Sequence, residues 1–400
     1  MSGRGRAPAG DGGGRRGPFL PRLYAPGPVA VPPEVLEALA RPVVHHRTDA
    51  FRASFLRVRA ALAEVLEAPG DDVMLLTGSG TTAFEAALVA AVPRGARLLA
   101  LRGGKFGERW ATMARALGYR VREHDVAWGR AFDVDGLARR LTERERPEAV
   151  TLVHSETSTG VLHDVAALAA VVRAHAPDAL ILVDAVTSLA AAELRPRAWG
   201  LDAVVAGSQK GVMLPPGLGF VWLSERAWAR AADGDGRGRA SAYALDLHRE
   251  RPRQRSGDSG TTPATSLVVA ADVALGLLLE AGLARRREAL GRRNGALLAA
   301  GAALGAAPFA ERPTPAVAAM TTPDGLAAPD VVRALAARGV RIAGGQDRLA
   351  PHLLRPSLLG HGDDYDAVVL AAALEDAWRD LGRAVPHGAA VSAAMAVLDR

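Results

Sequence analysis

Apolar residues follow two alternating spacings from about residue 51 to about residue 205. Some segments repeat apolar residues every three or four positions, as helices with one buried face do. Others are short continuous apolar runs, which are typical of parallel strands buried on both faces of a sheet. The pattern predicts helices over residues 51–67, 81–92 and 106–117, and strands at 73–76, 97–101, 150–153, 180–183 and 204–205.

The pattern changes after residues 261–265, which read Thr-Thr-Pro-Ala-Thr. Beyond this break we expect long helices around 266–283 and 285–305, a strand near Val317, a helix over 329–338, strands near Val340 and Leu353, and a last helix over 364–381. Strands that alternate with helices indicate the α/β class. We therefore expect an N-terminal arm and a large α/β domain over residues 18–265, and a smaller α+β domain over 266–385.

The two ends of the chain differ from its body. Residues 1–22 are rich in Gly and carry five arginines against Asp11, which is +4 of the formal net charge of +6. The remaining charges are mixed in sign, so the net charge predicts no nucleic-acid partner. We expect residues 1–17 to be a disordered tail, because such a composition buries little apolar surface. Residues 386–400 are expected to be a loosely held C-terminal tail.

No continuous apolar run is long enough and free enough of charge to cross a bilayer. The richest run, residues 267–284, contains Asp272 and Glu280 and is better interpreted as a buried helix. The N-terminus has no hydrophobic stretch of the signal-peptide type. We therefore expect no membrane association and a cytoplasmic protein.

Two residue types are scarce enough to be informative. The absence of cysteine excludes a disulfide framework, a thiolate metal site and a catalytic thiol, and the residues predict no metal site. Only Lys105 and Lys210 are lysines among 49 basic residues. A lysine amine can lose its proton and attack a carbonyl, which a guanidinium cannot do. Lys210 follows a predicted strand on a turn of small residues, so it is a candidate Schiff-base lysine, with an ordinary surface lysine as the alternative.

Residues 78–83 read Gly-Ser-Gly-Thr-Thr-Ala between a predicted strand and a predicted helix. Backbone N–H groups at a helix start, together with the helix dipole, favour a bound phosphate. The spacing also fits a loose dinucleotide pattern, but the next strand ends at Leu101-Arg102 without the carboxylate that this pattern requires. A single phosphate is the favoured ligand.

Further candidates lie at strand and helix ends. Asp184 ends an apolar strand, where it could pair with the ring nitrogen of a pyridine cofactor or only cap a turn. Residues 154–160 place hydroxyls and a carboxylate on one loop. Phe106 could stack on a flat cofactor or belong to the core. Arg355, within an apolar strand of the smaller domain, could bind a substrate carboxylate or form an ordinary salt bridge.

The order of these features resembles the class V aminotransferases of the alanine–glyoxylate and serine–glyoxylate branch, which are pyridoxal-phosphate enzymes of fold type I. The resemblance runs from about Tyr24 to Gly382. It implies a mostly parallel seven-stranded sheet between helices and a smaller C-terminal domain. The stretches that carry it are 27–33, 78–87, 106–109, 156–162 and 207–217.

The resemblance also implies a role for each candidate. Lys210 would hold pyridoxal 5'-phosphate as an internal aldimine and move the proton between Cα and C4′. Asp184 would pair with the pyridinium nitrogen, and Arg355 would bind the substrate carboxylate. The remaining positions would surround these groups: Phe106 and Val186 on the two ring faces, Thr157 at the ring hydroxyl, Ser79, Gly80, Thr81 and Gln209 at the phosphate, and Gly27 near the substrate.

In the family that the chain resembles, a tyrosine and a threonine of the partner subunit complete the phosphate site. Thr261 can supply the threonine, but Asp258 stands where the tyrosine is expected. An acid there would repel a phosphate, so Asp258 points away or the loop alignment differs. The resemblance implies a homodimer with its active site at the subunit interface.

The implied activity is transfer of an amino group between a small amino acid, such as alanine, serine or glycine, and a 2-oxo acid such as glyoxylate or pyruvate. A lyase, decarboxylase or epimerase of the same fold is the first alternative. Cysteine desulfuration is excluded because the chain has no thiol. A nicotinamide-dependent oxidoreductase with Arg102 at a 2′-phosphate, and a nucleic-acid binder acting through the basic tail, are the alternatives from other classes.

Overall fold

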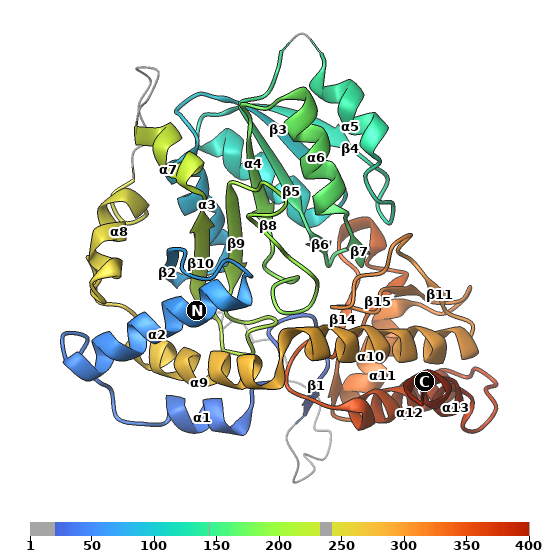
Figure 1. The fold of residues 1–400 in the computed structure, drawn as a ribbon. Helices are drawn as coiled ribbons and strands as arrows, with labels where there is room; N and C mark the ends of the chain where they lie inside the picture. The colour runs from blue at the N-terminus through green and yellow to red at the C-terminus, as the bar shows by residue number, and fades with distance from the viewer. Residues whose placement is uncertain (1–20, 144, 233–241, 400) are drawn as a thin grey trace, which may run out of the picture.

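The computed structural model describes residues 21–143, 145–232 and 242–399 (Figure 1). The expected disordered tail, residues 1–17, lies outside the described residues. A central sheet of seven strands has the order β2-β10-β9-β8-β5-β3-β4. The strands are β2 (Val73–Gly78), β10 (Gly217–Leu223), β9 (Ala203–Gly207), β8 (Leu180–Asp184), β5 (Ala149–Val153), β3 (Arg97–Arg102) and β4 (Arg120–Asp125).

Only β10 runs against its neighbours in this sheet, because it pairs antiparallel with both β2 and β9. The pairs β9–β8, β8–β5, β5–β3 and β3–β4 are parallel. The expectation of a mostly parallel seven-stranded sheet is therefore confirmed.

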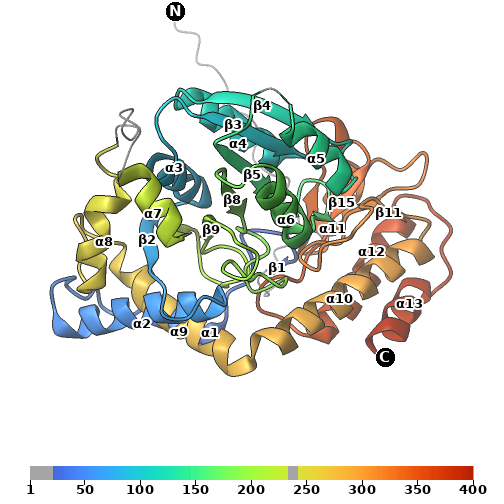
Figure 2. The ribbon, with the colours of Figure 1, turned by 45° about the horizontal axis from the view of Figure 1, so that its top comes forward.

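Successive residues of each strand enter different hydrophobic cores, as the two-residue period of a strand requires. Ile181 and Val183 of β8 pack on one face, whereas Leu180 and Leu182 pack on the other. The first face is covered by α1 (Pro33–Leu39), α2 (Asp49–Val65), α5 (Val134–Leu141), α6 (Val165–His175) and α9 (Thr265–Ala281). The second is covered by α3 (Gly80–Ala91), α4 (Lys105–Ala116), α7 (Glu225–Ala232) and the start of α8 (Leu247–Arg255) (Figure 2).

A separate core forms in the C-terminal part of the chain. Its four-stranded sheet has the order β11-β12-β15-β14, built from β11 (Ala307–Pro308), β12 (Met320–Thr321), β15 (Leu353–Arg355) and β14 (Ala343–Gly344). The helices are α10 (Leu283–Ala303), α11 (Ala328–Ala337), α12 (Asp364–Asp380) and α13 (Ala389–Leu398). The N-terminal arm joins this part, because β1 (Arg22–Leu23) pairs with β13 (Val340–Arg341).

Two expectations about organisation are corrected. The helix expected to open the smaller domain, α9, buries Val268, Leu275 and Leu278 in the core of the large domain. The break between the two cores lies at Gly282, where α9 and α10 meet at 84°. The expected loose C-terminal tail instead forms α13, which packs on α10 and α12. Its first N–H groups are capped by Glu375, whose carboxylate accepts from Gly388 N at 2.7 Å and Ala390 N at 3.0 Å.

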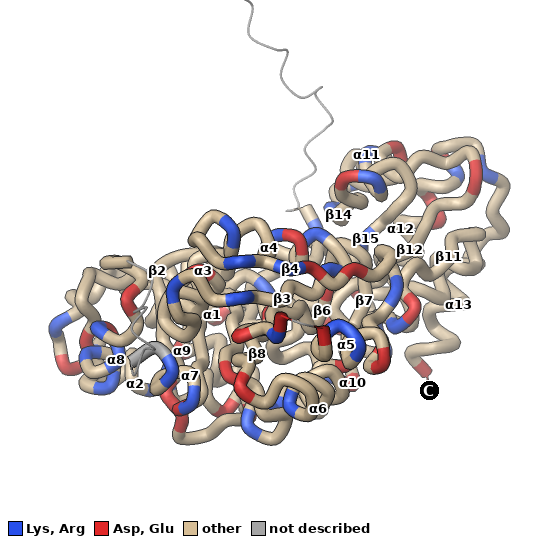
Figure 3. Tube along the Cα trace, turned by 90° about the horizontal axis from the view of Figure 1, so that it is seen from above, with Lys and Arg blue, Asp and Glu red and all other residues tan. Residues whose placement is uncertain are grey.

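No single helix among the described residues is long and apolar enough to cross a membrane. The bent pair α9 and α10 passes that test only when both helices are taken together, and both bury apolar faces in the cores. Acidic and basic positions are intermingled along β3, β4 and the helices around them (Figure 3), in line with the mixed charges of the chain body.

The docking of α13 can be tested with two substitutions on that helix. Ala394 is fully buried whereas Ala396 is exposed. Ala394→Asp should lower the free energy of unfolding by about 2 kcal/mol or more, because it buries an unpaired carboxylate. Ala396→Asp should stay within about 0.5 kcal/mol of the parent protein. Urea denaturation measures both, and equal, negligible effects would show that α13 is undocked.

Candidate active site

The direction of the strands gathers the candidate residues at one edge of the central sheet. The parallel strands β3, β5, β8 and β9 all end there, and β2 points the same way because β10 runs against both β2 and β9. Asp184 is the last residue of β8, and Lys210 lies three residues beyond β9. Ligand sites of open α/β sheets form at this edge.

The amine of Lys210 is enclosed by the N-terminal arm. Its Nζ donates a hydrogen bond to the carbonyl oxygen of Pro26 at 2.7 Å. A Cβ placed on Gly27 would lie 2.4 Å from Nζ, and the φ of Gly27 is +144°, so only glycine fits there. Burial, with a smaller contribution from the charge of Arg355, lowers the pKa of Lys210 to about 8. A neutral, nucleophilic amine is therefore accessible near neutral pH.

Asp184 is a buried carboxylate that forms no ion pair among the described residues. Burial raises its pKa to about 7, and the Val186 N–H, which donates to Oδ1 at 2.8 Å, works in the opposite direction. A cationic ring nitrogen beside it would restore the ionised form. The carboxylate is thus suited to a protonated heterocycle.

The start of α3 forms a cradle of small residues. Ser79 caps the helix by accepting from Thr82 N at 3.2 Å, and the first turn contains no acidic residue. A Cβ on Gly80 would lie 2.8 Å from Val186 Cγ2, so the cradle and Val186 are in contact. The Oε1 atom of Gln209 is buried beside Gly207 and has no hydrogen-bond partner in the described part of the chain. This unpartnered amide indicates a missing polar ligand, since rotating the amide would present its NH₂ group to an anion.

Glu156 connects the loop after β5 with the start of α4. Its fully buried carboxylate accepts hydrogen bonds from Phe106 N at 3.0 Å and Gly107 N at 3.1 Å, and from Ser158 N and Oγ. A Cβ on Gly104 would lie 2.5 Å from this carboxylate, which leaves room only for glycine. The position of Phe106 is thereby fixed relative to the neighbouring Thr157.

Arg355 reaches the same edge from β15 of the smaller domain. Its Nη1 donates to the carbonyl oxygen of Thr157 at 2.9 Å, and its Nε donates to Gly344 O at 2.7 Å. Burial lowers the pKa of this arginine. Within the described residues Nη2 makes no hydrogen bond, so this part of the guanidinium remains for a ligand.

Comparison with known proteins agrees with this arrangement. The family model described as Aminotransferase class-V matches residues 26–359. The chain belongs to the class V aminotransferase family. It is 38% identical over 382 residues to a protein named soluble hydrogenase 42 kDa subunit from Anabaena cylindrica, covering 94% of this chain and 98% of that protein. It is 29% identical over 394 residues to a serine–glyoxylate aminotransferase of Methylorubrum extorquens, covering 96% and 97%.

Comparison with a solved structure also indicates an aminotransferase. An aspartate aminotransferase of subgroup IV from Thermus thermophilus superimposes with a TM-score of 0.83 at 40% identity, covering 90% of this chain and 99% of that chain. The protein is therefore a pyridoxal-phosphate-dependent aminotransferase of fold type I, as its sequence predicts. The enclosed amine, the buried carboxylate and the unpartnered amide beside a helix start all fit this cofactor.

The segment expected to act on the partner subunit follows α8. Thr261 in this segment is exposed. The Ala264 N–H donates to Thr77 Oγ1 at 3.0 Å, which holds the segment beside the end of β2. Asp258 is partly buried, and its N–H bonds Arg253 O at 3.0 Å.

The contacts of three charged residues bear on the sequence predictions. Arg102, which would bind the 2′-phosphate in the nicotinamide alternative, is occupied by Asp125 through two hydrogen bonds of 2.7 Å, which removes support from that alternative. Lys105 pairs with Asp347 of the smaller domain at 2.7 Å. Arg109 was not assigned a role, yet it lies beside the phosphate cradle. Arg109 lies on α4 one turn after Phe106, and this spacing is the sequence feature from which its position near the site could have been predicted.

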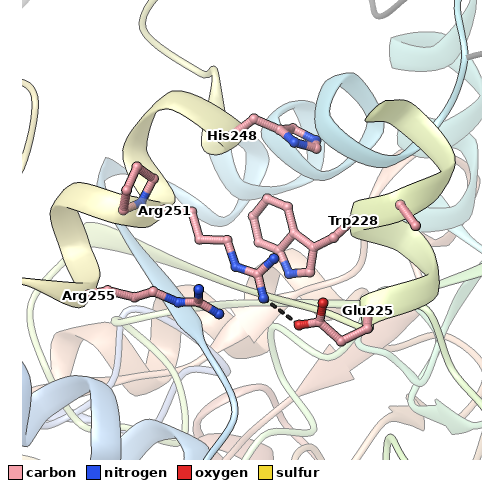
Figure 4. Close-up of a pocket in the computed structure, with 7 residues that line it drawn as sticks. Glu225, Trp228, His248, Arg251 and Arg255 are labelled. Carbon is pink, nitrogen blue, oxygen red and sulfur yellow. Dashed lines mark hydrogen bonds and ion pairs between the residues drawn. The ribbon is translucent and has the colours of Figure 1, made fainter. Parts of the chain in front are cut away.

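A surface cavity of about 520 Å³ between α7 and α8 is separate from these residues (Figure 4). The guanidinium of Arg251 lies over the ring of Trp228, with Cζ 4.3 Å from the centroid, and pairs with Asp72 and Glu225. Arg255 also pairs with Asp72. Because both arginines already have carboxylate partners, the cavity offers little free charge to a ligand.

The opposite pKa shifts of the two lysines can be measured directly. Burial lowers the pKa of Lys210 to about 8, whereas the pair with Asp347 raises the pKa of Lys105 above its usual value. After reductive ¹³C-methylation of the cofactor-free protein, the two lysine NMR signals should therefore titrate separately, with Lys210 losing its proton first. Lys105→Arg assigns the signals. Coincident titration at the ordinary lysine pKa would show that Lys210 is solvated.

Proposed function

We propose that this aminotransferase moves an amino group between a small amino acid, such as alanine, serine or glycine, and a 2-oxo acid such as glyoxylate or pyruvate. The observation that carries the proposal is the position of Arg355, which reaches the Lys210 edge with one unused nitrogen. One carboxylate clamp suits a substrate with one carboxylate. The serine–glyoxylate aminotransferase relative supports the same substrate class.

We assign Lys210 as the Schiff-base lysine. When bound, pyridoxal phosphate supplies an electron sink for the bonds at the substrate Cα. Lys210 would hold the cofactor and, once displaced from it by the substrate, would accept the proton from Cα as a free amine. The lowered pKa of about 8 supports this step, because a substantial neutral fraction exists near neutral pH. Asp184 would keep the proton on the ring nitrogen by remaining ionised beside it.

The other candidates orient the cofactor. Ser79, Gly80, Thr81 and Gln209 would bind the phosphate at the helix start. Phe106 and Val186 would pack on opposite faces of the ring, and Thr157 would bond the ring hydroxyl. Gly27 leaves the space that the Lys210 side chain occupies.

The enzyme is proposed to act as a cytoplasmic homodimer. The exposure of Thr261 supports this proposal, because an exposed threonine is available to complete the phosphate site of a second subunit. The serine–glyoxylate branch that the chain resembles completes its phosphate site in this way.

The assignment of Lys210 is tested by Lys210→Ala. The wild-type protein supplied with pyridoxal phosphate should absorb visible light and gain the mass of one cofactor on borohydride reduction, whereas the variant should do neither. Lys105→Ala is the matched control and should behave as wild type. A wild-type protein that stays colourless and gains no mass would contradict the assignment.

Addition of an amino donor then separates transamination from its alternatives. The visible band should disappear with alanine or serine as the cofactor accepts the amino group. A band that persists while a decarboxylated, cleaved or inverted amino acid is released would instead support a lyase, decarboxylase or epimerase.

The carboxylate clamp is tested by Arg355→Gln. Loss of a charge-assisted hydrogen bond should raise KM for the amino donor by about tenfold to a hundredfold. The visible spectrum of the bound cofactor should change little. Arg341→Gln removes an exposed arginine of the same domain and should leave KM unchanged. An unchanged KM in the Arg355 variant, or a preference of the wild type for aspartate over alanine, would overturn the single-clamp proposal.

A further inference from the structure

Arg109 places a guanidinium beside the phosphate cradle. Its Nη1 lies 3.4 Å from Thr81 Oγ1, and Thr81 stands in the first turn of α3. Its Cζ lies 4.9 Å from the centroid of the Phe106 ring. Arg109 therefore borders both the cradle and the aromatic residue assigned to the cofactor ring.

The charge of Arg109 is not neutralised within the described part of the chain, where this arginine forms no ion pair. Neighbouring arginines are paired: Arg102 bonds Asp125, and Arg115 bonds Glu123. Burial sets the pKa shifts of Asp184 and Lys210, and the Arg109 charge adds a smaller downward contribution to both. Its field therefore reaches the two central groups of the site.

The cradle itself provides only partial positive charge. A helix start contributes roughly half an elementary charge, and Ser79 already uses one donor of α3 for capping. Lys210 is required for the covalent link, and Arg355 is held by the carbonyls of Thr157 and Gly344. Among the described residues near Thr81, Arg109 is thus the formal cation that remains available for an anion.

We propose that Arg109 is the counter-charge of the cofactor's phosphate group, which it holds from the Thr81 side of the cradle. The proposal rests on the proposed function, because it assumes that pyridoxal phosphate is attached at Lys210. Arg109 acts on the phosphate, in contrast to Asp184 and Lys210, which act on the ring nitrogen and the aldehyde carbon.

The test compares two aldehydes that differ only in the phosphate. Cofactor-free protein is titrated with pyridoxal phosphate and with pyridoxal, and Kd is obtained from the visible absorbance of the bound aldehyde. Arg109→Gln should weaken pyridoxal phosphate by about tenfold to a hundredfold, the range of a charge-assisted hydrogen bond, and should leave pyridoxal unchanged. Arg109→Lys should recover part of the loss.

The matched control is Arg139→Gln, which removes an exposed arginine on α5 that forms no ion pair among the described residues. It should change neither Kd. Equal weakening of both aldehydes by Arg109→Gln would overturn the proposal and indicate support of Phe106 instead. An unchanged Kd for pyridoxal phosphate would also overturn it. A wild-type protein that binds neither aldehyde covalently would refute the proposed function itself.

Discussion

The common direction of the strands is the constraint on which the site depends. Residues from Ser79 to Lys210 are far apart in the chain, and they converge because β2, β3, β5, β8 and β9 end at one edge of the sheet. Two other parts of the chain close this edge. The N-terminal arm brings Pro26 and Gly27 against Lys210, and β15 brings Arg355 against Thr157.

Burial shifts the pKa values of Lys210 and Asp184 in opposite directions. It disfavours charge on both, which lowers the pKa of Lys210 to about 8 and raises that of Asp184 to about 7. A pyridine aldehyde would suit both groups, because it would react with a neutral amine and offer a ring nitrogen to the acid. Strongly shifted pKa values of this kind are typical of functional sites.

The predictable features are those written in short stretches of sequence. Strand ends and helix starts singled out Ser79, Phe106, Asp184 and Lys210 as candidates, and continuous apolar runs located the parallel strands. Features that depend on packing between distant parts of the chain could not be predicted from the sequence. The antiparallel β10 follows from its pairing with two strands, and α13 is stabilised by Glu375 of another helix. The assignment of α9 to the large domain likewise depends on contacts with α1 and α2, which its own composition does not reveal.

The scarcity of lysine in this chain can be explained by the electrostatics of the site. A phosphate needs positive charge near it. Arginine at position 109 supplies charge without a competing nucleophile, because a guanidinium stays protonated and does not condense with an aldehyde. The other lysine, Lys105, is paired with Asp347 and keeps its proton more strongly. The proposed covalent link to Lys210 would therefore meet little competition from other side-chain amines, because arginine carries the positive charge at the other basic positions.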